Sequence, residues 1–266
     1  MCVVDSKLEW VVYDSQQDSL TSAEKQVATG AAALQDQALV NLCHELRTPL
    51  TVMTGYLEVL SEDWGAQMPQ EAAAIVQRMR LSAVEVVQTV ENLLDWVSGL
   101  AGDGGMLIES IVTAELVAEV ASALELLAQR KGLRLQWELR QAPRAIRADR
   151  RALRRILLNL ILNGLKFTAQ GGVTVRMSIS EGCEAPAQLR VDVCDTGIGI
   201  APEEVARIFA PFVQLSQNDT RRYRGLGLGL ALVKRDVSSL GGRIEVRSRL
   251  GAGSIFRIEI PQAVLA

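Results

Sequence analysis

The sequence predicts a chain of class α plus α+β, in which an antiparallel helical hairpin is followed by an α/β sandwich. Before residue 98, apolar residues recur at three- and four-residue steps in two long runs, as they do on amphipathic helices. Beyond residue 106, helical runs alternate with short stretches of period two, which are typical of strands. The glycine-rich stretch "SGLAGDGGM" at 98–106 separates the two parts, and 266 residues are enough for two domains.

Two helices with a short connection are expected in the first part. The first run extends from about Thr21 to Ser61, and its apolar stripe consists of Leu34, Ala38, Leu42, Leu46, Leu50, Met53 and Leu57. The second run extends from Glu71 to about Trp96, with Ile75, Met79, Ser82, Val86, Val90, Leu93 and Val97 on its stripe. Such a pair forms an αα-hairpin. Because a lone hairpin cannot cover its own stripes, we expect two copies to form a dimeric four-helix bundle.

The second part predicts a mixed sheet with helices on one face. We expect helices near residues 112–130, 149–168 and 226–240. We expect strands near residues 133–139, 172–179, 187–194, 243–248 and 254–260.

Composition excludes several classes of protein. A net charge of −3 gives no case for nucleic-acid binding, which favours a basic domain or stripe. We interpret the basic cluster from Arg140 to Arg155 as the solvated face of a helix. No segment approaches the ~18 consecutive apolar residues of a membrane span. We therefore expect no nucleic-acid partner and no membrane span in this chain.

The cysteines indicate a reducing compartment. Cys2, Cys43, Cys183 and Cys194 are scattered, and no pair has the C-x2-C spacing of a zinc site. Reduced thiols fit a cytoplasmic location, either for a free protein or for the cytoplasmic part of a larger or membrane-tethered one.

Polar residues line one face of the helix expected at 149–168. Asn159, Asn163 and Lys166 fall within roughly 60° of one another on a helical projection. Carboxamide oxygens can ligate Mg²⁺, and a lysine suits phosphate oxygens. Taken alone, the same face could be a strip that only meets solvent.

The stretch "LRVDVCDTGIGI" at 189–200 ends a strand with an acid. Asp195 continues the alternation of Leu189, Val191 and Val193, so its carboxylate is expected to point inward, where it needs a partner such as an adenine amino group. Gly197 and Gly199 would let the backbone approach a flat ligand. The alternative is a simple turn.

A second glycine-rich stretch, "RGLGLGLALVK" at 224–234, leads into a helix. Backbone N–H groups at a helix start favour phosphate. The stretch is not a Walker loop, because no G-K-[ST] ends it. By itself it is weak evidence for a ligand.

The only histidine lies in "NLCHELRTPL" at 41–50. A lone histidine on a helix is usually a core or surface ring. Here it heads an ordered series of motifs, "CHELRTPL", "LLNLILNGLKFT", "DTGIGI", "IFAPFVQ", "GLGLGLALVK" and "GGRIEVRS" with "GAGS". Over about residues 23–261 this series resembles the H, N, G1, F, G2 and G3 boxes of the sensor histidine kinases.

The resemblance implies the fold and the domains. The family has a dimerisation and histidine-phosphotransfer hairpin, followed by an ATP-binding α/β sandwich of the Bergerat type. It implies that residues 23–98 form the hairpin, 99–106 the linker and 107–262 the catalytic domain. Residues 1–22 would be the end of an upstream sensor or of a signal-transmitting helix.

The resemblance also implies roles for individual residues. His44 matches the phosphoacceptor, Glu45 the acidic residue that takes its proton, and Thr48 the position that aligns water for phosphatase action. The ATP-binding positions would be Asn159, Asn163, Lys166, Asp195, Gly197, Gly199, Phe209, Phe212, Gly225, Gly227, Gly229 and Ser254. Asn163 matches the Mg²⁺-binding asparagine, whereas Gly164 stands where the family usually has alanine.

The implied function is Mg-ATP-dependent autophosphorylation of His44 in a homodimer. The phosphoryl group would then pass to an aspartate in the receiver domain of a response regulator, with phosphatase activity on that regulator as an added option. One alternative is a gyrase-like or chaperone ATPase, which would lack the motif around His44. The other is an ATP-sensing scaffold in which partner binding or dephosphorylation dominates.

Overall fold

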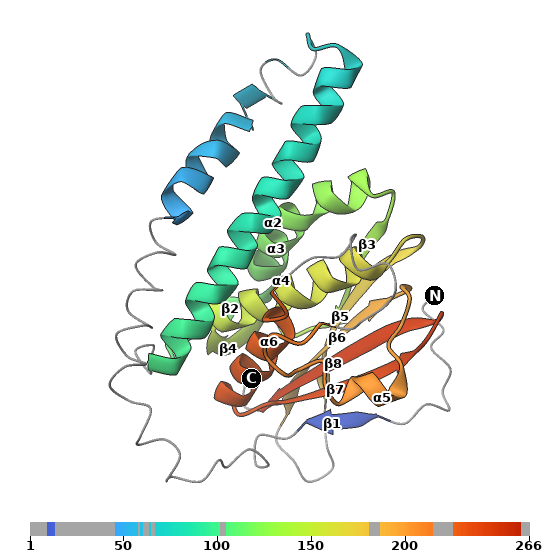
Figure 1. Cartoon of the computed structure of the whole chain (residues 1–266). Helices are drawn as coiled ribbons and strands as arrows, with labels where there is room; N and C mark the ends of the chain where they lie inside the picture. Colours follow the sequence, from blue (N-terminus) through green and yellow to red (C-terminus); the bar gives the residue numbers. More distant parts are fainter. Residues whose placement is uncertain are drawn as a thin grey trace, which may run out of the picture. The chain divides into compact units, whose positions relative to one another are not determined.

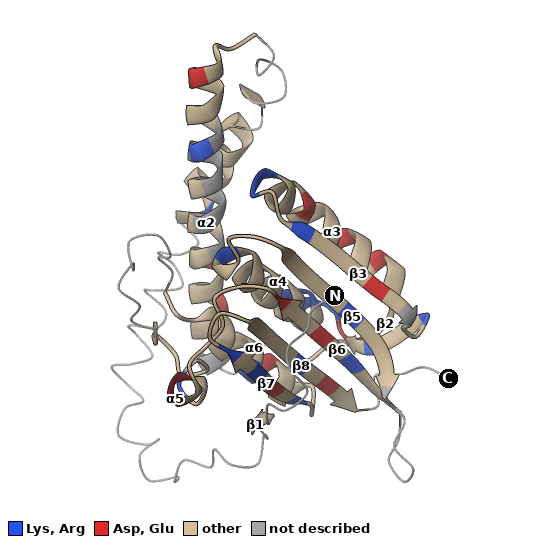
Figure 2. Cartoon of the chain, turned by 90° about the vertical axis from the view of Figure 1, so that its right-hand side faces the viewer, with Lys and Arg blue, Asp and Glu red and all other residues tan. Residues whose placement is uncertain are grey.

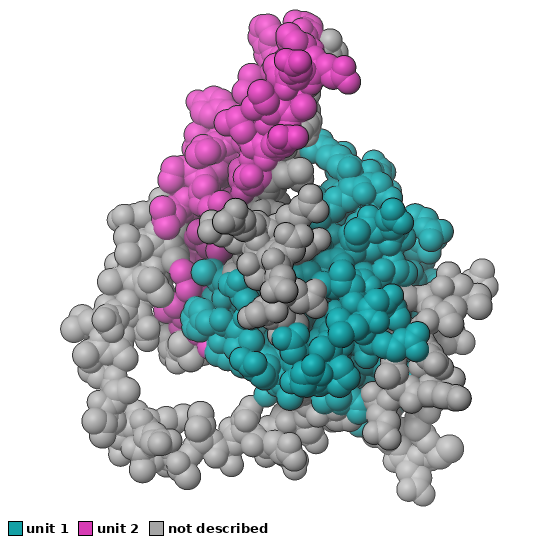
Figure 3. Space-filling view, turned by 45° about the vertical axis from the view of Figure 1, so that its right-hand side comes forward, with its two compact units in different colours: residues 1–19, 106–266 teal, residues 20–105 magenta. Residues whose placement is uncertain are grey.

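The computed structural model describes residues 10–13, 46–57, 59–60, 64, 67–101, 105–180, 187–214 and 226–261. The chain divides into two compact units, which Figure 3 colours separately. Residues 20–105 form the helical unit, and residues 1–19 together with 106–266 form the sheet unit. Within the described ranges, none of the helices combines the length and apolar character that crossing a membrane requires.

The helical unit contains an antiparallel pair of helices (Figure 1). Residues 46–57 and 59–60 are helical, and α2 comprises Gln70–Ala101. Val90 and Leu94 are buried against Leu50 and Leu93, so the two apolar stripes meet as their spacing predicts. An ion pair of 3.2 Å between Arg47 Nη2 and Glu91 Oε1 also joins the helices. The predicted antiparallel pair is therefore present from residue 46 onward, and α2 continues three residues into the predicted linker. The earlier part of the predicted first helix, with Leu34, Ala38 and Leu42, lies outside the described residues.

The sheet unit is built on six strands in the order β1-β7-β8-β6-β5-β3. The strands are β1 (Val11–Tyr13), β3 (Arg134–Gln141), β5 (Gly172–Ser180), β6 (Gln188–Asp195), β7 (Arg243–Arg249) and β8 (Gly253–Pro261). Only β3 and β5 pair in parallel, so the sheet is mixed, as predicted. A separate antiparallel pair consists of β2 (Ile108–Val112) and β4 (Ala145–Asp149).

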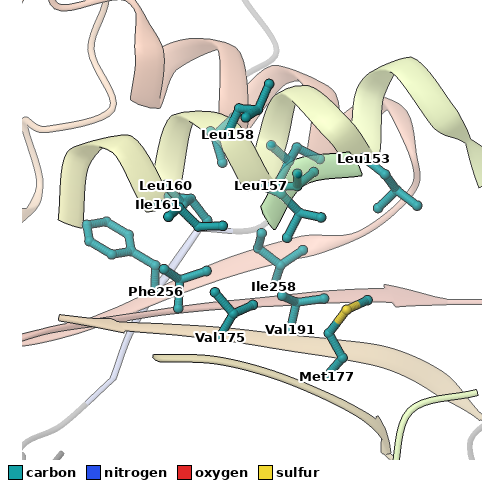
Figure 4. Packing of buried hydrophobic residues seen from close by; sticks show 14 of the residues in the cluster. Leu153, Leu157, Leu158, Leu160, Ile161, Val175, Met177, Val191, Phe256 and Ile258 are labelled. Carbon is teal, nitrogen blue, oxygen red and sulfur yellow. The ribbon is translucent and has the colours of Figure 1, made fainter. Parts of the chain in front are cut away.

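Helices cover one face of this sheet (Figure 1). They are α3 (Thr113–Arg130), α4 (Arg150–Phe167) and α6 (Gly229–Ser239), while the short α5 (Pro202–Val205) follows β6. Figure 4 shows Leu157 and Ile161 of α4 above Val175 and Val191 of the sheet, all four at most 2% exposed. Burying alternate strand residues under helix stripes is the main favourable term for this layer.

Two predictions need correction. The basic cluster from Arg140 to Arg155 is only partly helical, because β4 lies inside it and α4 begins at Arg150. The strands β1, β2 and β4 were not expected from the sequence. In β2 only Ile111 is buried, so the period-two alternation that reveals a strand is faint there.

Candidate functional site

The helix α4 starts at a defined cap and carries the first set of predicted site residues. Asp149 Oδ1 accepts a hydrogen bond from the backbone N–H of Ala152 at 2.9 Å, which satisfies a free donor at the helix start. Asn163 and Lys166 are half-buried, and Lys166 Nζ lies 5.4 Å from the centroid of the Phe167 ring. The end of α4 therefore presents a carboxamide, an ammonium and an aromatic ring.

Asn159 is buried rather than solvent-facing, with 5% of its surface exposed. Its Nδ2 donates to the backbone carbonyl of Arg155 at 3.0 Å. A Cβ placed on Gly229 would lie 2.8 Å from Asn159 Oδ1, so the glycine at the start of α6 lets that helix approach α4 closely. The alternative of a simple solvent strip does not apply to Asn159.

Asp195 ends β6 with its carboxylate buried, as the alternation of the strand predicts. Its Oδ1 accepts the backbone N–H of Gly197 at 2.8 Å, and Ser254 lies opposite it on β8. Burial raises the pKa of Asp195 to about 6, although hydrogen bonds from Gly197 and from Ser254 act to lower it. A buried acid with a raised pKa is a common mark of a functional site.

The turn after Asp195 presses against the end of α4. Ile198 donates its backbone N–H to the carbonyl of Phe167 at 3.2 Å. A Cβ on Gly197 would lie 2.6 Å from that carbonyl oxygen, and Gly199 has a φ of 70° with the backbone of Arg249 behind it. Any larger residue would push this turn away from the neighbouring backbone, so the two glycines allow it to pack closely beside Asp195.

Sequence reasoning overlooked Phe167 and Ser248 as parts of this region. Phe167 directly follows Lys166, which was the available signal. Ser248 has no such signal. Its Oγ accepts the N–H of Ile200 at 2.8 Å and lies 2.9 Å from Ser254 Oγ, so it joins the glycine turn to β8.

The two predicted phenylalanines lie in different environments. Phe209 is 4% exposed and belongs to the hydrophobic core. Phe212 is 58% exposed and has a φ of 61°, and its N–H donates to the carbonyl of Gly227 at 3.1 Å. Gly227 has a φ of 70°, and a Cβ there would lie 2.6 Å from Val213 O. Phe212 and Gly227, which lie on either side of residues 215–225, are therefore held together by this hydrogen bond.

The N-cap residue of α6 gives the start of the helix no side-chain hydrogen bond. Leu228 occupies the cap position and offers no hydrogen bond to the first turn. The N–H groups at the start of this helix therefore suit an anion, the role expected of the glycine-rich stretch.

Three predicted residues, His44, Glu45 and Gly225, lie outside the described residues. Thr48 lies exposed in the helix of residues 46–57. The structure thus brings together Asn159 with Gly229, Asp195 with Gly197 and Ser254, and Phe212 with Gly227.

No group of three or more His, Cys, Asp or Glu side chains that could hold a metal occurs among the residues that the structure describes. The half-buried Asn163 carries a carboxamide oxygen, a type of donor that can ligate Mg²⁺.

Two family models match the chain in succession. Residues 34–102 match the His Kinase A (phospho-acceptor) domain. Residues 148–264 match the histidine kinase-, DNA gyrase B-, and HSP90-like ATPase. The first match sets the chain apart from gyrase-like and chaperone ATPases, since it covers the motif around His44.

Curated relatives and solved structures agree with these matches. An uncharacterized sensor-like histidine kinase of Rhizobium meliloti is 35% identical over 235 residues, which are 88% of this chain and 44% of that protein. The circadian input-output histidine kinase CikA of Synechococcus elongatus is 32% identical over 90% of this chain and 31% of its own length. The crystal structure of full-length ShkA in complex with AMPPNP superimposes with a TM-score of 0.63 at 34% identity, over 86% of this chain and 46% of that one.

The chain spans less than half the length of these relatives. Its two matched regions occur in the order phospho-acceptor domain, then ATPase domain. The chain therefore belongs to the sensor histidine kinases of two-component signalling and carries their ATP-binding catalytic domain.

Proposed function

We propose that this chain is an ATP-dependent protein kinase that phosphorylates its own His44 and passes the phosphoryl group to an aspartate of a response-regulator receiver domain. The observation that carries the proposal is the buried Asp195 beside a tightly packed glycine turn, in a chain that also has a phospho-acceptor domain. The oxygens of a buried carboxylate can accept a hydrogen bond from the amino group of adenine.

The same geometry supports a site for the whole nucleotide. Asp195 and Ser254 would read the base edge, and the backbone of Gly197 and Gly199 would lie against the ring. The start of α6 at Gly229, where the N-cap residue is Leu228, would face the phosphates. Lys166 would add a positive charge beside them.

Asn163 would hold Mg²⁺ through its carboxamide oxygen, together with phosphate oxygens of the nucleotide. When bound, the ion supplies positive charge that neutralises the phosphate oxygens. Asn159 is the second carboxamide of this face, and its packing against Gly229 would fix the distance between α4 and the phosphates.

The transfer step needs a nucleophile from the helical unit. A neutral imidazole is competent near neutral pH. A ring nitrogen of His44 would attack the γ-phosphorus, the bond to the bridging oxygen would break, and ADP would leave with the electron pair. Glu45 would take the ring proton. Positioning and charge neutralisation would supply most of the rate enhancement.

Thr48 supports a second activity on the same partner. It is exposed in the helix of residues 46–57, one turn beyond His44 in sequence. Its hydroxyl would align water for attack on the phosphorylated aspartate of the regulator. A regulator dephosphorylation assay with Thr48→Ala tests this role, and unchanged dephosphorylation would exclude it.

The apolar stripes support a homodimer. In one copy, Leu46, Met53, Ile75, Met79 and Val86 are each 45–59% exposed, although all belong to the predicted stripes. A large contiguous exposed apolar patch marks an interaction surface. A second hairpin would cover them in a four-helix bundle.

The deciding experiment is autophosphorylation with γ-labelled ATP and Mg²⁺, comparing the wild type with His44→Ala. Acid-labile label on the wild type alone is expected, since a phosphorus–nitrogen bond hydrolyses in acid. ATP binding should be equal in the two proteins. Label that persists in His44→Ala would reject the assignment of the nucleophile. An unlabelled wild type that still binds ATP would reject the kinase and favour a scaffold or phosphatase.

A further inference from the structure

The ATP-binding sheet contains a strand that comes from the other side of the helical unit in sequence. β1 pairs antiparallel with the edge strand β7, with Val11 opposite Val246, Val12 opposite Glu245 and Tyr13 opposite Ile244 (Figure 1). Backbone pairing of this kind is how a sheet edge binds an extended segment.

The open face of the sheet carries a continuous row of alternating charge. Neighbouring strands place Glu138, Arg176, Asp192, Arg257 and Glu245 opposite one another in that order. Arg176 Nε lies 2.7 Å from Glu138 Oε2, and Arg257 Nε lies 2.8 Å from Asp192 Oδ1. Figure 2 shows basic and acidic residues distributed across these strands. The row ends at β7, beside β1.

Trp10 adds a side-chain contact to this backbone pairing. Its ring centroid lies 4.2 Å from Cζ of Arg257 and 5.7 Å from Cζ of Arg247. A guanidinium over an indole face is favourable, and tryptophan is the best aromatic partner for it. The segment at residues 10–13 is thus bound by backbone pairing with β7 and by two cations at the Trp10 ring, Arg247 of β7 and Arg257 of β8.

This pairing changes how the units are connected. The helical unit of residues 20–105 lies in sequence between the two pieces of the sheet unit. With β1 docked, the ATP-binding sheet is attached to the helical unit through the chain on both sides of it. With β1 released, only the connection before β2 remains.

We infer that residues 10–13 are an intramolecular ligand of the β7 edge, which restrains the ATP-binding unit, and that their release speeds autophosphorylation of His44. This inference rests on the proposed kinase function. Transfer requires the nucleotide to reach the histidine, and a second attachment reduces the orientations that the ATP-binding unit can sample. Docking therefore lowers the population of the reactive arrangement.

Two variants release β1 without changing the nucleotide site. Trp10→Ala removes the contacts with Arg257 and Arg247, and Trp10→Phe retains an aromatic face. The double variant Val11→Pro with Val12→Pro removes two successive N–H groups, one of which must face β7. Trp64→Ala is the matched control, because Trp64 is 55% exposed in the helical unit.

Two readouts keep docking and activity separate. Hydrogen exchange of β7, whose N–H groups are present in every variant, reports docking, and the initial rate of labelling at saturating ATP reports restraint. We expect about tenfold faster exchange and about threefold faster labelling in Trp10→Ala and in the double proline variant. Trp10→Phe should lie between them and the wild type, and Trp64→Ala should match the wild type.

Either of two results would overturn the inference. The β7 strand of the wild type could exchange as fast as β7 of the double proline variant, which would show that β1 does not dock. The labelling rate could stay equal or fall when docking is lost, which would show that docking does not restrain the enzyme. A wild type without label, but with protected β1, would instead reject the proposed function while leaving the docking in place.

Discussion

Arg155 of α4 holds Asp236 of α6 through two hydrogen bonds, from Nε to Oδ2 at 2.6 Å and from Nη2 to Oδ1 at 2.7 Å. The aspartate is 3% exposed, so the pair fixes the two helices that carry the residues proposed to face the phosphates. Two-pronged pairs of this kind add geometric specificity as well as energy.

The substitution Asp236→Ala should therefore destabilise the protein. The substitution leaves Arg155 partly buried without its carboxylate, and we expect the free energy of unfolding in urea to fall by about 3 kcal/mol. ATP affinity should fall as well, because α6 loses its position. Glu138→Ala removes a more exposed partner of Arg176 and should cost less than about 1 kcal/mol. Equal losses in the two variants would contradict this account.

Because of Asp195, the nucleotide-free protein should be less stable at neutral pH than at acidic pH. Burial raises its pKa from an ordinary value of 3.8 to about 6, so the folded state binds the proton more tightly than the unfolded state. Stability from this group is greatest below about pH 4 and is lost as the pH rises through about 6. Asp195→Asn should thus raise the free energy of unfolding at about pH 8 by up to about 3 kcal/mol.

The same substitution should weaken ATP binding. The amide loses the charge-assisted hydrogen bond to the base, which is worth about tenfold or more in affinity. Titration calorimetry and urea unfolding on one pair of proteins measure both effects. A variant that is less stable than the wild type at about pH 8 would show that the carboxylate is not strained by burial.

Substitutions at Gly164 and Val173 should have coupled effects on the free energy of unfolding. A Cβ on Gly164 would lie 2.8 Å from Val173 Cγ2, so Gly164→Ala should destabilise the protein by about 1 kcal/mol despite the better helix propensity of alanine. In a Val173→Ala background the same change should become stabilising. The double-mutant cycle should give a coupling of about 2 kcal/mol. Gly55→Ala, with nothing within 4 Å, is the uncrowded control.

Gly227→Ala should weaken nucleotide binding through a steric clash, in addition to the strain that a left-handed backbone imposes on alanine. Gly227 and Gly251 have φ values of 70° and 74°, but only at Gly227 would a Cβ meet a neighbour, the carbonyl of Val213. Both substitutions should carry the backbone strain of about 1 kcal/mol. Only Gly227→Ala should reduce ATP affinity, about tenfold or more, because the added Cβ would push Val213 away from Gly227 next to the start of α6. Equal affinity in the two variants would argue against a role for this junction.

The homodimer should depend on the exposed part of the helical stripes. Met79→Glu introduces a charge at a 51% exposed apolar position and should convert the dimer to monomers in sedimentation experiments at micromolar concentration. Arg78→Glu is the matched control one residue away, at an exposed position off the stripe. A monomeric wild type, or dissociation of the control as well, would reject this interface.

Elements with strong local periodicity were predictable from sequence. The alternation of Leu189, Val191 and Val193 predicted β6 and the burial of Asp195, and both were observed. The helical projection of Asn159 predicted its face but not its burial, because α6 covers it from elsewhere in the chain. No local pattern could join Arg155 to a residue 81 positions away.

Short strands were the hardest to predict. β1, β2 and β4 depend on partners distant in sequence, and three to five residues carry little periodic signal. The assignments that depend on His44, Glu45 and Gly225 remain predictions, since these residues lie outside the described part of the chain.

The charge pattern of the open face also protects the sheet from misalignment. Arg190 lies opposite Glu259, and Asp192 lies opposite Arg257. Sliding β8 by two residues against β6 would place Glu259 beside Asp192, or Arg257 beside Arg190, so that like charges meet. Sliding by one residue would turn these charges into the apolar layer. Burial of charge therefore disfavours a shift by one residue, and repulsion between like charges disfavours a shift by two. Together the two effects limit misaligned folding intermediates.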